Sequence, residues 1–422
     1  MPRSLPNVRF SLICFAALAL ALPIAFVSLA KVLLILGFLV VVVGAWLRHE
    51  SQPALSASRA APAILLALAA MFISSLWSTG SSDQVLNALV KHGRLLVIPV
   101  LLCMTRSRRE VLVALAFFIG GQIFLLASTW LLFLGAPIPW VISKEAGVCV
   151  NCSFAIFSSY LDQSIMTAVL AAVCWHLRHH VNPRYRAVFA LAIPALALIC
   201  VFFIFQGRTG HLVAIMLITL AIAWELPKRL RLLAVLLPLA LLLALAAGSS
   251  RVSQGLREIG GSLESFSNSG DLSSSSGMRL DLWRRSIQSI AENPGLGTGV
   301  GSWSREFRRQ EIVHLKEIPI NGASAQHQNP HQEYLLWAVE LGLPGLALLC
   351  AVLLALYRDS LRLDQPDRRA TQSVLAALAL ACVFNCTLYD AMIGDFFCIT
   401  LALLLALGSP VAAPPSAVPS TV

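Results

Sequence analysis

The sequence contains few charged residues. They make up 12% of its 422 residues, whereas a soluble globular chain averages about 25%. Hydrophobic residues reach 58%, and apolar runs long enough to cross a hydrocarbon core of about 30 Å recur along the chain. This composition excludes a soluble globular protein and predicts an all-α, polytopic membrane protein.

The hydropathy pattern predicts about 12 transmembrane helices and one large loop that carries short amphipathic helices. The helices are expected near residues 10–28, 30–47, 60–77, 86–104, 111–135, 161–177, 187–206, 209–226, 231–248, 334–357, 372–389 and 391–409. The expected organisation is therefore transmembrane helices over 1–248, a loop subdomain over 249–333, transmembrane helices over 334–410 and a Pro/Ser/Ala-rich, disordered tail over 411–422.

The basic residues, 31 against 21 acidic ones, gather in alternate short loops. Clusters such as "RSRR", "RHHVNPRYR" and "KRLR" follow the fourth, sixth and eighth predicted spans. The positive-inside rule places these loops and both termini in the cytoplasm, and the long loop outside. Because the charge is sorted by loop, we expect membrane lipids and no nucleic acid as partners.

The outer segments lack the motifs of two common phosphate-binding chemistries. They contain no Asp-x-Asp or carboxylate cluster of the kind that holds a divalent ion, so we expect no metal and no cofactor. The stretch "GLGTGVG" (295–301) lacks the Lys-Ser/Thr of a P-loop and follows a helix instead of a strand. We interpret it as a flexible turn.

Cysteine is also scarce outside the spans. Cys149 and Cys152 stand in an outer loop as "CVNC". A local disulfide in an oxidising compartment is favoured over a redox motif, which would need a thioredoxin-like context. Zinc would require two further ligands, and none is near in the sequence.

One segment of the outer loop has the pattern of an amphipathic helix. Apolar residues recur there at helical spacing, namely Leu280, Trp283, Ile287 and Ile290. The following "ENPG" predicts the end of the helix. Arg279 stands one turn before Trp283, where it is either an ordinary solvated arginine or a ligand for an anion. Arg284 and Arg285 are expected in solvent or near lipid headgroups.

The stretch "NPHQEYL" precedes the tenth predicted span. Asn329 is expected to cap the helix and Pro330 to lie in its first turn. His331 would then lie in the same turn, where the helix dipole disfavours imidazolium and leaves a neutral base. The alternative is an interfacial histidine that only hydrogen-bonds to the loop.

Three further basic residues lie at the outer ends of predicted spans. Arg208, in the turn "FQGRTGH", either snorkels to headgroups or binds an anionic ligand. Lys91 and Arg94 lie about one helical turn apart on one face. Their partner is either a phosphate or an acidic residue such as Asp162 or Asp395.

The turn "RTG", the pair "SGMRLDLW" and "NPGLGTGVGSW", and "NPHQEYL" follow one another in the C-terminal half. In their order, spacing and common side, they resemble motifs of the O-antigen ligase and O-antigen polymerase superfamily. The N-terminal half is similar in hydropathy only. The resemblance implies a metal-independent glycosyltransferase at the periplasmic face of the bacterial inner membrane. Its lipopolysaccharide ligase moves a polysaccharide from undecaprenyl pyrophosphate to the lipid A-core.

The same resemblance implies that Arg208 and Arg279 hold the pyrophosphate and that His331 assists the acceptor hydroxyl, with inversion at the anomeric carbon. Lys91 and Arg94 are further candidates for substrate binding. The implied partners are the undecaprenyl-pyrophosphate-linked glycan and the lipid A-core.

Three alternatives remain open. An O-antigen polymerase would share the donor, but the single large loop before "NPHQEYL" favours the ligase. A protein O-oligosaccharyltransferase is the second alternative, and such enzymes usually extend further after the last spans. A transporter of lipid-linked sugars would carry charges through the middle of several spans. Here the charges gather on one side, which favours an enzyme.

Overall fold

Helices are the only regular secondary structure among the residues that the computed structural model describes. These are 4–47, 58–140, 154–250, 253–254, 257, 260–261, 275–314 and 328–408. Among them, seven helices are long and apolar enough to cross a membrane, and three more are apolar but shorter. The all-helical membrane class is therefore confirmed, while the count of about 12 spans stays a prediction. Cys149 and Cys152 lie outside the described residues, so their disulfide also stays a prediction.

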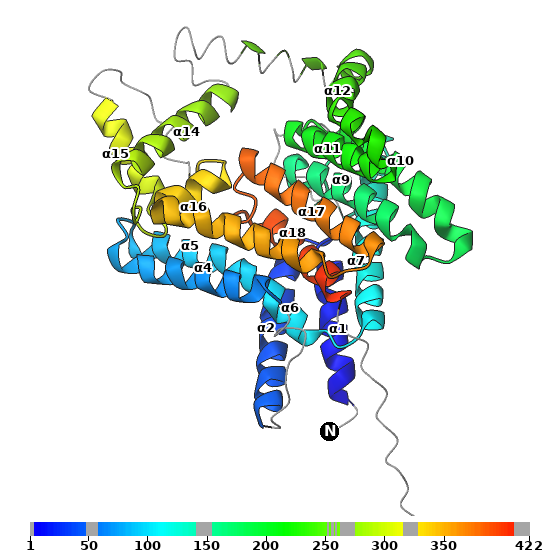
Figure 1. Ribbon diagram of the computed structural model, residues 1–422, viewed down its shortest axis with the longest axis horizontal. Helices are drawn as coiled ribbons and strands as arrows, with labels where there is room; N and C mark the ends of the chain where they lie inside the picture. The colour runs from blue at the N-terminus through cyan, green and yellow to red at the C-terminus, as the bar shows by residue number, and fades with distance from the viewer. Residues whose placement is uncertain are drawn as a thin grey trace, which may run out of the picture.

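Helices occupy the predicted apolar segments (Figure 1). The first are α1 (Ser4–Ala19), α2 (Ile24–Leu47), α4 (Ala60–Ser74), α5 (Ser82–His92), α6 (Val97–Met104), α7 (Arg108–Phe133) and α9 (Tyr160–Leu177). They are followed by α10 (Ile193–Ile199), α11 (Arg208–Glu225), α12 (Leu237–Gly248), α14 (Ser275–Glu292) and α15 (Trp303–His314). The last are α16 (Glu333–Ser360), α17 (Gln365–Phe384) and α18 (Ala391–Ala406).

The first connection lies earlier than the hydropathy pattern predicts. A turn was expected near residue 29, but α1 ends at Ala19 and α2 begins at Ile24. Pro23 stands between them. Proline has no N–H to donate and disfavours helical conformation in the residue before it. The chain therefore breaks before Pro23, and α2 runs unbroken for 24 residues.

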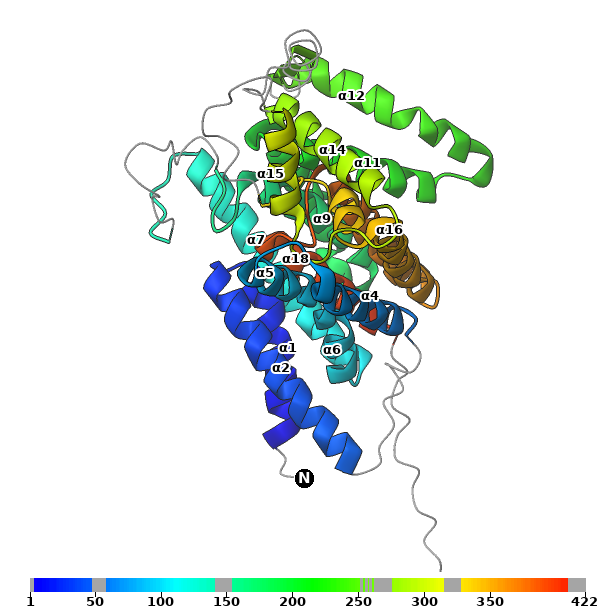
Figure 2. The same cartoon turned by 90° about the vertical axis from the view of Figure 1, so that its left-hand side faces the viewer.

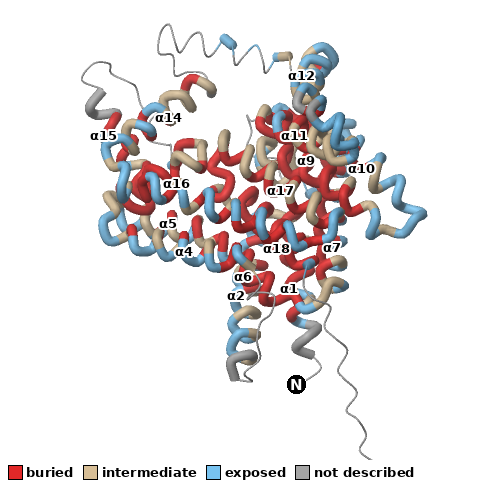
Figure 3. The backbone as a smooth tube through the Cα atoms, in the orientation of Figure 1, coloured by how far each residue is buried: buried red, intermediate tan, exposed pale blue. Residues whose placement is uncertain are grey.

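The core forms around α17 and α18. Helices α9 and α11 pack on one side, α16 and α4 on another, and α1, α6 and α7 enclose α18 (Figures 1 and 2). Burial is concentrated in this central group, whereas α2 and α12 have few or no buried residues (Figure 3). Large apolar side chains such as Leu36, Leu66 and Leu243 are more than half exposed. Extended apolar surface of this kind indicates contact with lipid.

Helix α16 is broken at Gly342, whose φ is 70° and ψ −164°. Pro344 follows the break and has no N–H with which to reach the carbonyl of Glu340. The N–H of Gly299 donates to that carbonyl instead, at 2.8 Å. The N–H of Leu343, in turn, donates to the carbonyl of Pro294 at 2.8 Å. The segment 294–299 thus satisfies the backbone groups that the break leaves unpaired.

The interpretation of "GLGTGVG" as a flexible turn is therefore wrong. Gly297, Gly299 and Gly301 have φ values of 64°, 89° and 76°, in the left-handed region that favours glycine. A Cβ at Gly299 would fall 2.3 Å from Ser78 Cα, and one at Gly301 2.6 Å from the carbonyl oxygen of Gln84. Close backbone approach fixes this loop, hereafter the glycine loop (residues 295–301), against the connection between α4 and α5.

Candidate active site

Arg208 is the first residue of α11 and brings that helix end to α14. Its Nη1 donates to Ser276 Oγ at 3.2 Å. The turn before it lies against α9, because a Cβ at Gly207 or Gly210 would fall 2.5 or 2.1 Å from Ser164 Oγ. Gly207 has an ordinary φ of −75°. The two glycines are therefore required by close packing and not by unusual backbone angles.

Arg279 is partly buried on α14, one turn after Ser276. Burial lowers the pKa of its guanidinium, and the positive charge of Arg208 lowers that pKa further, while Tyr160 opposes the shift. Two like charges held close together disfavour each other unless an anion joins them. The structure thus brings together the two arginines that the family resemblance implies as ligands of a pyrophosphate.

The first turns of three helices converge around these arginines. Tyr160 begins α9, Arg208 begins α11, and Ser276 is the second residue of α14. A helix N-terminus carries a partial positive charge and unpaired N–H groups, which favour an anion. The sequence motifs did not predict this convergence. The capping serine before α9, Ser159, was a signal for one of the three ends.

The prediction that His331 lies in the first turn of α16 is wrong, because His331 lies before that helix. The helix begins at Glu333, and its capping residue is Gln332, whose side chain accepts from the N–H of Leu335. Asn329 closes a separate turn, in which its Oδ1 accepts from the His331 N–H at 2.9 Å. His331 has a φ of 49°, a conformation that is uncommon outside glycine. The histidine is therefore presented by a tight turn.

Helix α14 is attached to that turn. Trp283 Nε1 donates to the carbonyl oxygen of Pro330 at 3.1 Å. Trp283 follows Arg279 by four residues, so both lie on the same face of α14. One helix face therefore carries Arg279 near the helix end and, one turn further on, the contact that positions the turn of His331.

The buried face of α14 differs from the predicted one. Ile287 is 57% exposed. The residues that are buried include Leu282, Arg285, Ser286 and Ser289. Helix α15 packs here, and Trp303 Nε1 donates to Ser286 Oγ at 2.9 Å. Arg285, expected in solvent, is 6% exposed and pairs with Asp281 at 2.9 Å. The predicted end of the helix at "ENPG" is confirmed.

Lys91 and Arg94 have different surroundings. Arg94 Nε lies 3.8 Å from Asp395 Oδ1, and its Nη1 donates to the carbonyl oxygen of Tyr389. Lys91 Nζ lies 4.1 Å from the centre of the Tyr389 ring and 3.5 Å from Gln328 Oε1. Arg94 thus has the acidic neighbour that was the alternative to phosphate, whereas Lys91 reaches the segment that leads to His331. Their role in substrate binding stays a prediction.

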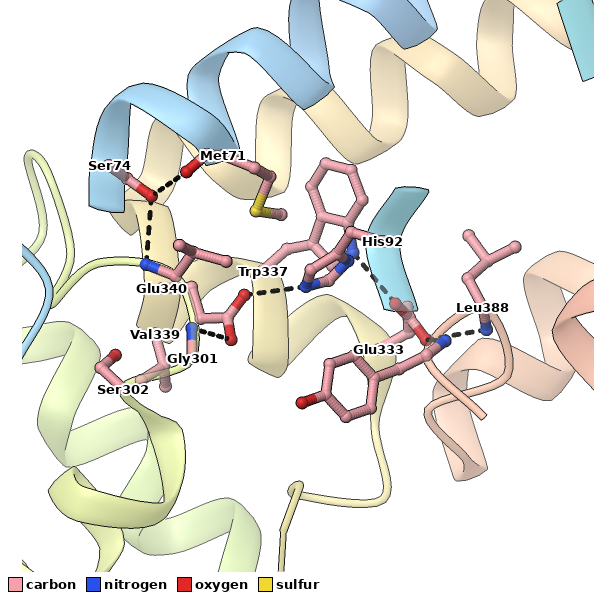
Figure 4. A network of polar contacts seen from close by, with 12 residues as sticks. Met71, Ser74, His92, Gly301, Ser302, Glu333, Trp337, Val339, Glu340 and Leu388 are labelled. Atoms are coloured by element: carbon pink, nitrogen blue, oxygen red, sulfur yellow. Dashed lines mark hydrogen bonds and ion pairs between the residues drawn. The ribbon is translucent and has the colours of Figure 1, made fainter. Parts of the chain in front are cut away.

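Glu340 connects the glycine loop to α5 inside the protein. Its Oε1 accepts from the Gly301 N–H at 2.8 Å, and its Oε2 lies 2.9 Å from His92 Nε2 (Figure 4). Both His92 and Glu340 are almost completely buried. Loss of one partner would leave a buried polar group unpaired, which is strongly destabilising. This pair therefore fixes the glycine loop, α5 and α16 in one arrangement.

Glu333 makes a second buried connection, at the start of α16. Its Oε1 accepts from Trp337 Nε1 and its Oε2 from the Leu388 N–H, both at 3.0 Å (Figure 4). Neither glutamate was predicted from the sequence to have a role. Glu333, Trp337 and Glu340 recur at helical spacing on one face. Acidic residues at those positions of an otherwise apolar helix were the available signal.

Residues 193–350 match the protein family described as O-Antigen ligase. This segment runs from α10 into α16 and contains Arg208, Arg279 and His331. The match confirms the resemblance to the O-antigen ligase and polymerase superfamily, and it indicates a membrane enzyme that acts on lipid-linked glycans. No curated protein matches the chain.

Proposed function

We propose that the protein transfers an O-antigen polysaccharide from undecaprenyl pyrophosphate to the lipid A-core, at the periplasmic face of the bacterial inner membrane. The observation that carries this proposal is the proximity of Arg208 and Arg279 where the first turns of α9, α11 and α14 converge. The site combines two guanidinium groups with the positive ends of three helices. It therefore suits a ligand with high negative charge, such as a pyrophosphate.

The two arginines would act on the leaving group. When the anomeric C–O bond breaks, its electron pair stays on the pyrophosphate and adds negative charge there. Guanidinium groups can donate two parallel hydrogen bonds to phosphate oxygens, and fixed donors of this kind stabilise a developing charge without reorganisation. In this mechanism Arg208 and Arg279 do the work that a bound metal does in other transferases.

His331 would act on the acceptor. Its imidazole takes the proton of the attacking sugar hydroxyl as the new glycosidic bond forms, and direct attack inverts the anomeric configuration. A positioned base typically accelerates such a step by about 10²–10⁴. The hydrogen bonds of Asn329 and Trp283 hold the turn of His331 in place. Lys91, close to Gln328, would contribute a further positive charge at the same end of the site.

The test is complementation of a Gram-negative strain that lacks its O-antigen ligase. We expect the wild-type chain to restore a polysaccharide-capped core, and Arg279→Ala to leave the core bare at equal expression. Arg284→Ala is the matched control, because Arg284 is an exposed arginine on the same helix. A bare core together with longer undecaprenyl-linked chains would instead identify a polymerase.

A further inference from the structure

A pocket of about 230 Å³ lies beside the glycine loop and has no part in the proposed transfer step. Asp83 and Asn87 of α5 line it together with Trp303 and Arg308 of α15. Its wall also includes Gln328 and Tyr389, together with Gln84, Gly301, Ser304 and Glu340. Roughly 300–1,000 Å³ is usual for pockets that hold drug-sized ligands. This pocket therefore suits a smaller group, of about the size of one sugar ring.

The polar groups of the pocket match the hydroxyls of a sugar. Asp83 offers acceptors, Arg308 offers donors, and the amide of Asn87 offers both. Each sugar hydroxyl also donates and accepts. A free anion would be repelled by Asp83 and Glu340, and a free cation by Arg308. The mixture of charges therefore favours a neutral, polyhydroxylated ligand.

Two of these side chains are available to a ligand. Asp83 and Asn87 are both exposed and lie four residues apart, so they are on the same face of α5. Within the part of the chain that the structure describes, neither side chain forms a hydrogen bond or an ion pair. Their polar atoms can bind a ligand without the loss of an existing contact.

The pocket adjoins the end of the site where the acceptor is expected. Gln328, in its wall, precedes His331 by three residues and accepts from Lys91 Nζ at 3.5 Å. Tyr389, also in its wall, lies beneath the same ammonium group. The pocket is thus connected to the turn of His331, whereas Arg208 donates to Ser276 of α14.

We infer that this pocket binds one sugar ring of the acceptor oligosaccharide and so presents a hydroxyl of that oligosaccharide to His331. The inference rests on the proposed transfer to a saccharide acceptor. Glu340 also lines the pocket while it binds the Gly301 N–H, so the same carboxylate that fixes the glycine loop forms part of the wall.

The first experiment measures binding without catalysis. Delipidated core oligosaccharide is titrated into the purified full-length protein in the absence of any donor. We expect Asn87→Ala and Asp83→Ala each to weaken binding by about 3- to 10-fold, the usual effect of one lost hydrogen bond. Arg284→Ala and Arg279→Ala should bind as the wild type does. Equal binding by wild type and both pocket variants, or no binding by the wild type, would overturn the inference.

The second experiment separates the two sugar substrates. In a transfer assay, Asn87→Ala should raise the KM for the lipid A-core by about 3- to 10-fold and leave the KM for the donor unchanged. An increase in the donor KM alone would assign the pocket to the donor glycan and overturn the acceptor assignment. Asn87 is an exposed helical residue and alanine favours helix, so the fold should be retained. If the wild type binds the oligosaccharide but transfers nothing, the proposed function fails and the pocket assignment stands.

Discussion

The indole of Trp283 donates a hydrogen bond to the carbonyl oxygen of Pro330, at 3.1 Å and across 47 residues of sequence. This contact joins the helix that carries Arg279 to the turn that carries His331. The distance between the proposed base and the proposed pyrophosphate ligands therefore depends on how α14 lies against one tight turn. Trp283 acts as a positioning residue in this arrangement.

Replacing that indole should loosen the turn without removing a ligand. We expect Trp283→Phe to lower kcat by about fivefold, because the lost hydrogen bond is worth about 1 kcal/mol and its loss misplaces His331. Affinity for the undecaprenyl-pyrophosphate donor should change little. A tenfold loss of donor affinity at unchanged kcat would instead make Trp283 part of the donor site.

Substitution of Arg208 or Arg279 should lower transfer, whereas substitution of an ordinary surface arginine should not. Arg208→Ala and Arg279→Ala should each reduce transfer by about 10²–10³, as expected when a fixed donor to a developing charge is removed. Lysine should rescue each only in part, since it keeps the charge but not the planar pair of donors. Arg284→Ala serves as the control on α14. Full activity of both lysine variants would show that charge alone is required.

His331 can be tested with its backbone conformation preserved. Asparagine adopts a positive φ more readily than most residues, so His331→Asn should keep the turn and still lose transfer. His331→Ala should also lose transfer, and both variants should bind the donor as the wild type does. If His331→Gln kept full activity while His331→Ala lost donor binding, His331 would be a hydrogen-bonding anchor and not a base.

The proposed orientation of the site in the membrane can be measured with introduced cysteines. In a background without Cys149 and Cys152, a membrane-impermeant maleimide added to whole cells should label Ser274→Cys and miss Gln365→Cys. Gln365 is exposed at the start of α17, so disruption of the membrane should make it reactive. The reverse pattern would place Arg208, Arg279 and His331 away from the periplasmic donor and refute the mechanism.

The sequence predicted the positions of the helices better than their faces. Apolar runs and the "ENPG" stop identify the helices because these signals are local. The buried face of α14 could not be predicted from apolar spacing, since Ser286 is covered by Trp303 while Ile287 stays exposed. Which face of α14 is buried depends on the side chains of α15. The position of His331 relative to α16 could not be predicted either, because the residue that caps α16 is Gln332 and not Asn329.

Short sequence motifs can identify residues that the fold brings together, as the two arginines show. Arg208 and Arg279 belong to short motifs about 70 residues apart, and the fold brings them together through Ser276. The contacts that fix the glycine loop could not be predicted from the sequence, because they join the backbone of the loop to the break in α16. Gly342 and Pro344 marked that break in the sequence, but their partners lie in another segment.

The glycine loop offers a matched pair of substitutions that tests its packing. Gly299→Ala combines a φ of 89° with a Cβ that would fall 2.3 Å from Ser78 Cα, a backbone atom that cannot rotate away. Gly295→Ala meets no atom within 4 Å. We expect Gly299→Ala to lower the thermal unfolding midpoint by several degrees, because a strained residue alone costs about 1–3 kcal/mol. Gly295→Ala should unfold with the wild type in the same differential scanning fluorimetry assay. Equal midpoints for both variants would mean that the loop moves freely, as a flexible turn would, and that it does not hold α16 against α4 and α5.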